Sequence, residues 1–76
     1  MTEQVLRLLY PPEVRDLPII NQLIRHFDDL AVNILRAQVN STESWLEIQI
    51  VGSAAMIESA IGWLREKGVE VQTLSA

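Results

Sequence analysis

The spacing of the apolar residues is the feature that most restricts the fold of this chain. Some segments are compact apolar runs or alternate between apolar and polar side chains, as β-strands do. Others repeat apolar residues every three or four positions, as amphipathic helices do. The strand-like segments are residues 3–10, 31–39, 45–51 and 69–74, and the helical segments are residues 17–27 and a stretch that follows Ser53. The predicted order is strand, helix, strand, strand, helix, strand.

The first predicted helix is clearly separated from the strand before it. Pro11 and Pro12 lack the amide hydrogens that a continuing strand needs, so the strand is expected to end at Tyr10. Asp16 is a candidate N-cap, and Pro18 is tolerated in the first helical turn. The apolar stripe of this helix consists of Leu17, Ile20, Leu23, Ile24 and Phe27.

The second half of the chain predicts a hairpin followed by a capped helix. The turn formers of the hairpin are Asn40, Ser41, Thr42 and Glu43. Gly52 breaks the second hairpin strand, and Ser53 is a suitable N-cap for the helix. The apolar face of the helix comprises Met56, Ile57, Ala60, Ile61 and Leu64. Gly68 is expected to end the helix in a left-handed conformation.

Two residues of the second helix leave alternatives open. Gly62 costs about 1 kcal/mol relative to Ala within a helix. Either the close approach of another backbone offsets that cost, or the position is exposed and neutral. Trp63 lies at the margin of the apolar stripe, where it either packs at the edge of the core or contacts a partner.

The predicted order of elements indicates an α+β fold. Two β-α-β units with right-handed crossovers, joined through a hairpin, form a ferredoxin-like sandwich. Its four antiparallel strands make one sheet with both helices on one face. A chain of 76 residues buries only about 60 to 65% of its unfolded surface, so we expect a single domain of marginal stability unless it associates.

Strand alternation predicts which side chains point away from the helices. The expected inward residues are Leu6, Leu8, Leu35, Ala37, Val39, Leu46, Ile48, Ile50, Val69 and Val71. The expected outward residues are Val5, Arg7, Leu9, Ile34, Arg36, Gln38, Trp45, Glu47, Gln49 and Val51. The apolar outward residues Val5, Leu9, Ile34, Trp45 and Val51 are the predicted interface for self-association or a partner. The alternative is that they are ordinary surface hydrophobes, or that bulges turn some of them inward.

Composition excludes several classes of function. The chain has no cysteine, which rules out disulfides, thiolate metal sites and a cysteine nucleophile. Its formal net charge of −4 disfavours nucleic acid and anionic membranes as partners. RNA binding on this fold also needs several aromatic side chains on the sheet, whereas this chain offers mainly Trp45. The absence of a signal peptide and of a long apolar run predicts a cytoplasmic protein without direct membrane insertion.

No residue constellation indicates catalysis. His26 lies next to Phe27 and close to Asp28 and Asp29, a pattern compatible with a metal ligand or a general base. A cation at a helix C-terminus explains His26 equally well, and one His lacks the convergent ligands of a metal site. The serines lack a His in a nucleophile motif, and the glycines form no phosphate-binding loop. We therefore expect neither an enzyme nor a cofactor.

The tripeptide Asn33, Ile34 and Leu35 begins the strand that follows the first helix, within AVNILRAQV. In this position it resembles the NIL domain family, which is named for that tripeptide. The preceding PIINQLIRHFDD and the later AIGWLREKGVEV are also similar to that family, so the resemblance extends over nearly the whole chain. We accordingly expect residues 1–76 to be a single NIL domain, with an ACT-like fold.

The resemblance implies a regulatory function. NIL domains are best known at the carboxyl end of the ATPase subunit of bacterial methionine importers. There they bind L-methionine at a dimer interface and inhibit transport. Asn33 matches the family asparagine associated with methionine binding, and Ile34 and Leu35 match the rest of the motif. An Asn amide offers both a donor and an acceptor to an amino acid, but it equally suits a structural bond to neighbouring backbone.

Two functions remain open from the sequence. The first is a cytoplasmic homodimer that binds L-methionine or a related sulfur amino acid near Asn33, Ile34 and Leu35. The second is an interaction or assembly module without a small-molecule ligand. Met1 lies two residues before the first predicted strand, so the segment is either a domain of a longer chain or a stand-alone protein. A stand-alone protein is expected to act through a separate partner in trans. The family resemblance suggests a transporter or a ferredoxin-type protein as that partner.

Overall fold

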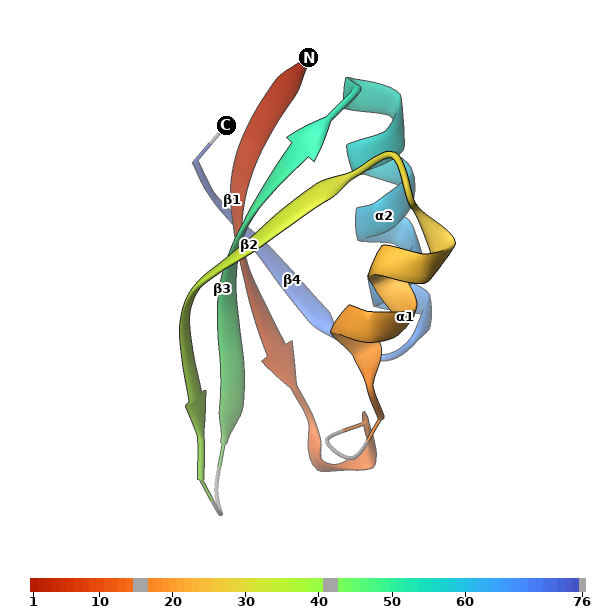
Figure 1. The fold of residues 1–76 in the computed structure, drawn as a ribbon. Coiled ribbons are helices and arrows are strands. Elements are labelled where there is room, and N and C mark those ends of the chain that lie inside the picture. The colour runs from red at the N-terminus through yellow and green to blue at the C-terminus, as the bar shows by residue number, and fades with distance from the viewer. Residues whose placement is uncertain (15–16, 41–42, 76) are drawn as a thin grey trace.

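The computed structural model describes residues 1–14, 17–40 and 43–75, and its elements follow the predicted order (Figure 1). The strands are β1 (Thr2–Tyr10), β2 (Ala31–Val39), β3 (Ser44–Gly52) and β4 (Glu70–Ser75). The helices are α1 (Ile19–His26) and α2 (Ala54–Glu66). The predicted strand ends agree with these bounds to within one residue. A short 3-10 turn, η1 (Pro12–Val14), precedes α1 and is not among the predicted elements.

Within the described residues the strands form one sheet in the order β2-β3-β1-β4, and every neighbouring pair is antiparallel. Both helices lie on the same face of this sheet (Figure 1). Ser75, near the end of β4, pairs with Val5 of β1. The arrangement confirms the predicted α+β ferredoxin-like sandwich. β2 and β4 are its edge strands.

α1 is shorter than predicted at both ends. Pro18 occupies its N-cap position and supplies no side-chain hydrogen bond to the first turn. The amide of Leu17 donates to the Val14 carbonyl at 3.1 Å, so Leu17 continues the turn after η1 and is not part of the helix. Phe27 ends the helix with a φ of −122°. The predicted cap Asp16 lies outside the described residues, as do Ser41 and Thr42 of the predicted hairpin turn.

α2 begins and ends as predicted. The Ser53 hydroxyl accepts a hydrogen bond from the Met56 amide at 3.1 Å. Gly68 has a φ of 93°, and the amides of Gly68 and Val69 donate to the carbonyls of Arg65 and Leu64. This pair of bonds is a Schellman motif, which satisfies carbonyls that the end of a helix leaves unpaired.

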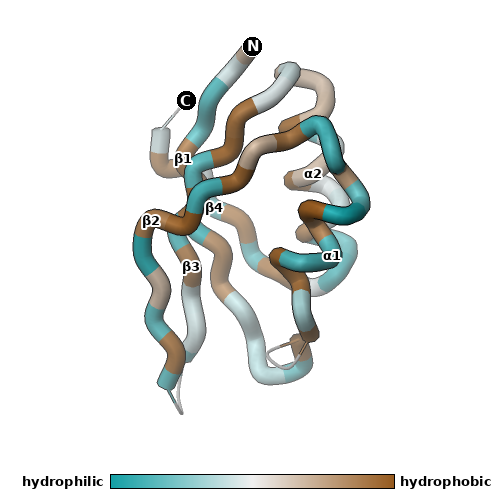
Figure 2. The backbone as a smooth tube through the Cα atoms, viewed as in Figure 1, coloured by the Kyte–Doolittle hydropathy of each residue, from teal (hydrophilic) through white to brown (hydrophobic). Residues whose placement is uncertain are grey.

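The core lies between the helices and the sheet. It consists of Leu6, Leu8, Val14, Ile19, Leu23, Phe27, Leu30, Ile48, Ile50, Ile57, Ala60, Leu64, Val69 and Val71. Apolar and polar residues alternate along much of the strands, which keeps one side of each strand for this core (Figure 2). The predicted inward positions on β1 and at Val69 and Val71 are confirmed, as are Ile48 and Ile50 on β3.

The glycine and tryptophan alternatives are resolved by packing. A Cβ atom at Gly62 would meet no heavy atom of the described residues within 4 Å, so Gly62 is an exposed helical glycine without close backbone contact. The close approach occurs instead at Gly52, where a Cβ atom would lie 2.3 Å from Cδ2 of Leu30. Trp63 is half-buried and packs against the edge of the core, as the first alternative predicts.

A β-bulge at Leu35 changes the predicted faces of β2. Ile34 pairs with Ile48, whereas Arg36 pairs with Glu47, so Leu35 has no partner residue on β3. Directly paired residues share a face, and Ile48 is fully buried beneath the helices. Ile34 therefore lies on the helix side, and its predicted outward position is wrong. The predicted inward position of Leu35 is also wrong, because the bulge leaves this side chain 51% exposed.

The far end of the β2-β3 hairpin is not covered by the helices. Ala37 and Val39 pair with Leu46 and Ser44 on the helix side, as predicted. They nevertheless remain exposed, Val39 by 76%, because the hairpin extends beyond α1 and α2 (Figure 1). Their predicted place on the inward face is confirmed, but their predicted burial is wrong.

Candidate functional site

The sheet surface opposite the helices, here called the open sheet face, carries most of the predicted site. Its side chains alternate along β1 and β3 with the buried core leucines and isoleucines. Across β2, β3 and β1 the register aligns Ala31 with Val51 and Glu3, Asn33 with Gln49 and Val5, Arg36 with Glu47 and Arg7, and Gln38 with Trp45 and Leu9. The predicted interface residues Val5, Leu9, Trp45 and Val51 thus share this face, each of them half-buried.

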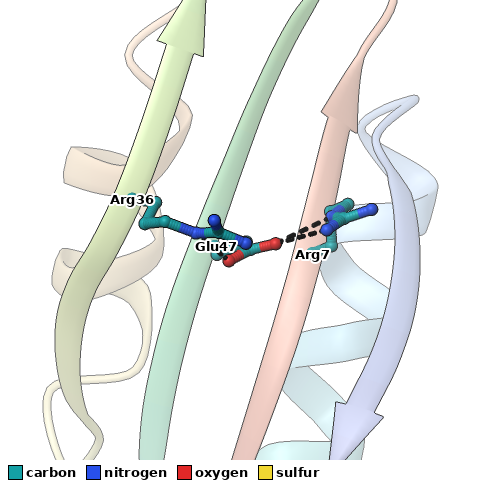
Figure 3. A network of polar contacts seen from close by, with 3 residues as sticks. All are labelled: Arg7, Arg36 and Glu47. Carbon is teal, nitrogen blue, oxygen red and sulfur yellow. Dashed lines mark hydrogen bonds and ion pairs between the residues drawn. The ribbon is translucent and has the colours of Figure 1, made fainter.

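An ion cluster occupies the centre of the open sheet face. Nε of Arg7 donates to Oε2 of Glu47 at 3.0 Å, and Nε of Arg36 donates to Oε1 at 2.7 Å (Figure 3). The two guanidinium groups approach the carboxylate from the strands on either side of β3. Only 5% of the surface of Glu47 remains exposed. Hydrogen bonds from Arg36 and then Arg7 lower the pKa of Glu47 to about 2, although desolvation opposes the shift.

The same two arginines lie against Trp45. Their guanidinium carbons are 5.3 Å and 5.7 Å from the centre of a Trp45 ring. These distances are within the range of cation–π contacts. The ion cluster therefore contacts the largest apolar side chain predicted for the interface, and two charged groups adjoin Trp45 on this face.

Asn33 belongs to a chain of side-chain hydrogen bonds on the open sheet face. Its Nδ2 donates to Oε1 of Gln49 at 3.1 Å, and Nε2 of Gln49 donates to Oε2 of Glu3 at 2.6 Å. A carboxylate only accepts hydrogen bonds, so Gln49 must turn its NH2 group toward Glu3 and its oxygen toward Asn33. Asn33 must then donate from its own NH2 group to the Gln49 oxygen. The arrangement directs Asn33 toward β3, and its Oδ1 is the acceptor that it can present to a ligand.

The three residues of the Asn-Ile-Leu tripeptide point in different directions. Asn33 lies on the open sheet face, Ile34 lies on the helix side with 58% of its surface exposed, and Leu35 lies at the bulge. All three belong to the edge strand β2. Within one chain, the open sheet face therefore presents Asn33 but not Ile34.

His26 and Trp63 form an aromatic pair between the helices. Their rings stack with centres 5.5 Å apart and planes 19° apart, and Lys67 lies 5.3 Å from the centre of a Trp63 ring. An open groove of about 390 Å³ adjoins them, and Gln22 and Arg25 complete its lining. In the described ranges, no group of three or more His, Asp or Glu side chains is placed to hold a metal ion.

Sequence reasoning missed two features of the site. It placed Arg7, Arg36 and Glu47 outward, but it did not predict that they meet. The pairing of Arg7 with Glu47 depends on the β1–β3 register, and that of Arg36 depends on the bulge at Leu35. It also assigned no role to Tyr10 and Ser44, which lie opposite each other at one end of the sheet. The charge pattern of the outward residues was the available signal for the first feature.

Among the described residues, no helix has the length and apolar character needed to cross a membrane.

Comparison with known proteins relates this arrangement to a family. A family model described as the NIL domain matches residues 4–73. The chain is similar to the solved C-terminal domain of an ABC transporter ATP-binding protein from Enterococcus faecalis. The identity is 29% and the TM-score 0.82, over 93% of this chain and 82% of that one.

The fold also resembles that of a designed protein. The de novo designed protein Foldit4 shares 16% identity at a TM-score of 0.62, over 99% of both chains, and this likeness concerns the fold alone. The search of curated proteins finds no match.

Proposed function

The chain belongs to the NIL domain family, and on this basis we propose that it is a small regulatory domain that binds L-methionine or a related sulfur amino acid. Binding takes place near Asn33, at the boundary between two copies of the chain. The likeness to the C-terminal domain of an ABC transporter ATP-binding protein supports a regulatory rather than a catalytic role. The proposal includes a cytoplasmic location.

The polarity of the Asn33 side chain carries this proposal. Its Oδ1 accepts a hydrogen bond from the ligand ammonium group, while the second hydrogen of Nδ2 is directed to the ligand carboxylate. Gln49 and Glu3 hold the Asn33 amide in the required orientation. Val51 lies diagonally opposite Asn33 on the same face and offers apolar surface to a thioether.

A second copy of the chain is needed to enclose the ligand. Asn33 is exposed, whereas small-molecule sites bury about 70 to 90% of the ligand surface. β2 is a nine-residue edge strand on which Ile34, Leu35 and Val39 are exposed apolar residues. A long exposed edge strand of this kind favours association with another chain. We therefore place the homodimer boundary along β2, beside Asn33.

Thermal unfolding with and without ligand tests the proposal. A ligand at ten times its dissociation constant adds about 1.4 kcal/mol of stability, which raises the Tm of a domain of this size by about 6 °C or more. We expect this shift with L-methionine but not with L-leucine or L-glutamate, together with the mass of a dimer in solution. Asn33→Ala should abolish the shift, and the matched control Asn21→Ala, an exposed position on α1, should retain it.

A second variant tests the orientation of Asn33 without changing that residue. Gln49→Leu removes the contact that holds the Asn33 amide, so we expect about tenfold weaker methionine binding, equivalent to one hydrogen bond. Gln38→Leu, at an exposed position of the same face, serves as the control. Unchanged affinity in Gln49→Leu would contradict the proposed role of the Asn33 side chain.

The exposed edge of β2 also supports the alternative of an interaction module that binds no small molecule. In that case β2 contacts a partner protein in trans, and a transporter or a ferredoxin-type protein is the proposed partner. Asn33→Ala separates the two functions, because it should leave partner binding nearly intact. The absence of any Tm shift with sulfur amino acids, combined with retained partner binding, would favour this alternative.

A further inference from the structure

The groove beside the stacked rings lies between the two helices, where α1 packs next to α2 (Figure 1). Its volume is about 390 Å³, which is within the range of small-molecule sites. It is here called the basic groove, and its lining residues are Gln22, Arg25, His26, Trp63 and Lys67. The sheet separates it from Asn33, so the basic groove is distinct from the proposed methionine site.

The basic groove gathers positive charge in a chain that is acidic overall. The formal net charge is −4, yet Arg25 and Lys67 both line this groove, and none of its described lining residues is acidic. Gln22 and His26 add further N–H donors. Each cation also suits the helix end near which it lies, but that effect falls off within one turn and does not require both cations to line one groove. The charge of the groove therefore favours an anion.

The two cations of the basic groove are not neutralised by a carboxylate of the described residues. Both ion pairs in the described ranges belong to the cluster around Glu47. Lys67 lies 5.3 Å from the centre of a Trp63 ring, and Arg25 forms no ion pair or hydrogen bond with the described part of the chain. Both side chains are exposed, so their N–H groups can reach a ligand in the groove.

The number of charges and donors indicates a phosphate group. A phosphomonoester carries about two negative charges near neutral pH and has three oxygens that accept hydrogen bonds. Two cations match this charge, and the planar guanidinium of Arg25 can bind two phosphate oxygens at once. A carboxylate has one charge and two oxygens, so it would leave part of the groove unpaired.

We propose that the basic groove binds the phosphate group of a small organic phosphomonoester. Arg25 and Lys67 donate to the phosphate oxygens, and Gln22 and His26 supply additional hydrogen bonds. The organic part of the ligand lies against Trp63, which is half-buried at the edge of the core. Inorganic phosphate shares the charged chemistry but lacks this organic part.

NMR titration of the isotope-labelled protein tests the proposal, at about pH 7.5, where the phosphate dianion predominates, and at constant ionic strength. His26 is the sole histidine of the chain, so its ring signals report directly on the groove. Phenyl phosphate probes the organic ester, and sodium phosphate probes the free ion. We expect saturable shifts at His26, Arg25 and Trp63 with phenyl phosphate, at a millimolar dissociation constant. Inorganic phosphate should bind more weakly, and phenol and benzoate at least about tenfold more weakly.

Substitutions of the two cations provide the second test. Arg25→Gln and Lys67→Gln each remove one charge from an exposed side chain, so both variants should stay folded and bind phenyl phosphate about tenfold more weakly. Arg65→Gln is the matched control, because it removes the same charge from α2 outside the groove. The Arg65 guanidinium donates to the Val71 carbonyl at 3.2 Å. Its substitution should leave the affinity for phenyl phosphate within about twofold of the unmodified chain.

Four results would overturn the proposal. The first is the absence of saturable shifts with phenyl phosphate. The second is equal binding of phenol or benzoate, which would exclude recognition of a phosphate dianion. The third is unchanged affinity in both Arg25→Gln and Lys67→Gln. The fourth is equal binding of inorganic phosphate, which would remove the role of Trp63 and assign the groove to the free ion. None of these measurements uses methionine or Asn33, so failure here is independent of the proposed regulatory function.

Discussion

Glu47 is an acidic residue on the open sheet face, yet it is as buried as several core residues. The reason is the pair of arginines on the neighbouring strands, which cover the carboxylate and neutralise its charge. A buried carboxylate is costly when unpaired, so the burial of Glu47 depends on Arg7 and Arg36 remaining in place. The cluster also covers part of Trp45 and thereby reduces the apolar surface of this face.

The lowered pKa of Glu47 predicts how stability depends on pH. The folded chain binds the Glu47 proton more weakly than the unfolded chain, whose pKa is near 4.5. The stabilisation is therefore complete above about pH 4.5 and is lost as the pH falls toward about 2. Urea unfolding should show that Glu47→Gln is less stable than the unmodified chain at about pH 6. This difference should shrink markedly at about pH 2.5.

Glu58→Gln is the matched control for this measurement, because Glu58 is exposed on α2. Its stability should follow that of the unmodified chain at both pH values. A gap between Glu47→Gln and the unmodified chain that stays constant with pH would show that the ion cluster does not contribute through the charge of Glu47.

At the scale of elements, α2 is associated with two glycines of opposite effect. Gly62 lies within the helix and disfavours it, whereas Gly68 follows the helix and adopts the positive φ of its end. Gly62 lies in the helix interior, and an added methyl group there would be free of contacts with the described residues. Gly68 has a positive φ and lies close to Val14. The two glycines therefore respond in opposite ways to the same substitution.

Gly62→Ala should stabilise the domain by about 0.5 to 1 kcal/mol, because alanine loses less backbone freedom than glycine when the helix forms. Gly68→Ala should destabilise it by about 1 kcal/mol or more, because the left-handed conformation brings the Cβ of alanine too close to the backbone. Thermal unfolding of both variants gives the test. A lower Tm for Gly62→Ala would indicate a packing contact at this position.

β2 shows that one element can follow two registers. Before Leu35 its even-numbered residues lie on the helix side, and after Leu35 its odd-numbered residues do. The bulge keeps Ile34 on the helix side and allows Arg36 to reach Glu47 on the opposite face. The strand itself was predictable from its composition, whereas the side of Ile34 was not.

At the scale of the whole molecule, the two edges of the sheet offer different surfaces for association. β2 exposes Ile34, Leu35 and Val39, whereas β4 is shorter and exposes Leu74. The proposed homodimer uses β2, so a charge on that edge should disrupt it.

In the proposed homodimer, Leu35→Lys should convert the dimer to a monomer, because it places a charge on the edge strand through which the two copies are proposed to pair. Sedimentation equilibrium measures the mass directly. Leu74→Lys is the matched control at the other edge, where 45% of the side chain is exposed, and it should remain dimeric. Dissociation by Leu74→Lys, with Leu35→Lys still a dimer, would move the interface to β4.

The sequence alone determined the order of the elements, the fold class, the cap and end of α2, and the similarity to the NIL family. These features depend on apolar periodicity and on residues whose effect on the backbone is local. Ser53 caps an amide three residues later, and Gly68 adopts the positive φ that ends the helix. The sequence also identified Asn33 as a candidate ligand contact. The local pattern was sufficient for the elements because apolar periodicity and capping residues mark strands and helix ends within a few positions of the chain.

Only the tertiary structure decided which residues meet across the sheet. Several features of the sheet involve residues that are distant in the sequence. They are the bulge at Leu35, the burial of Glu47 between two arginines, the contact of Asn33 with Gln49 and the pairing of Tyr10 with Ser44. A shift of one residue in the register moves a side chain to the other face, and no local pattern specifies that shift. The element order therefore follows from the sequence, whereas the chemistry of the open sheet face depends on the strand register.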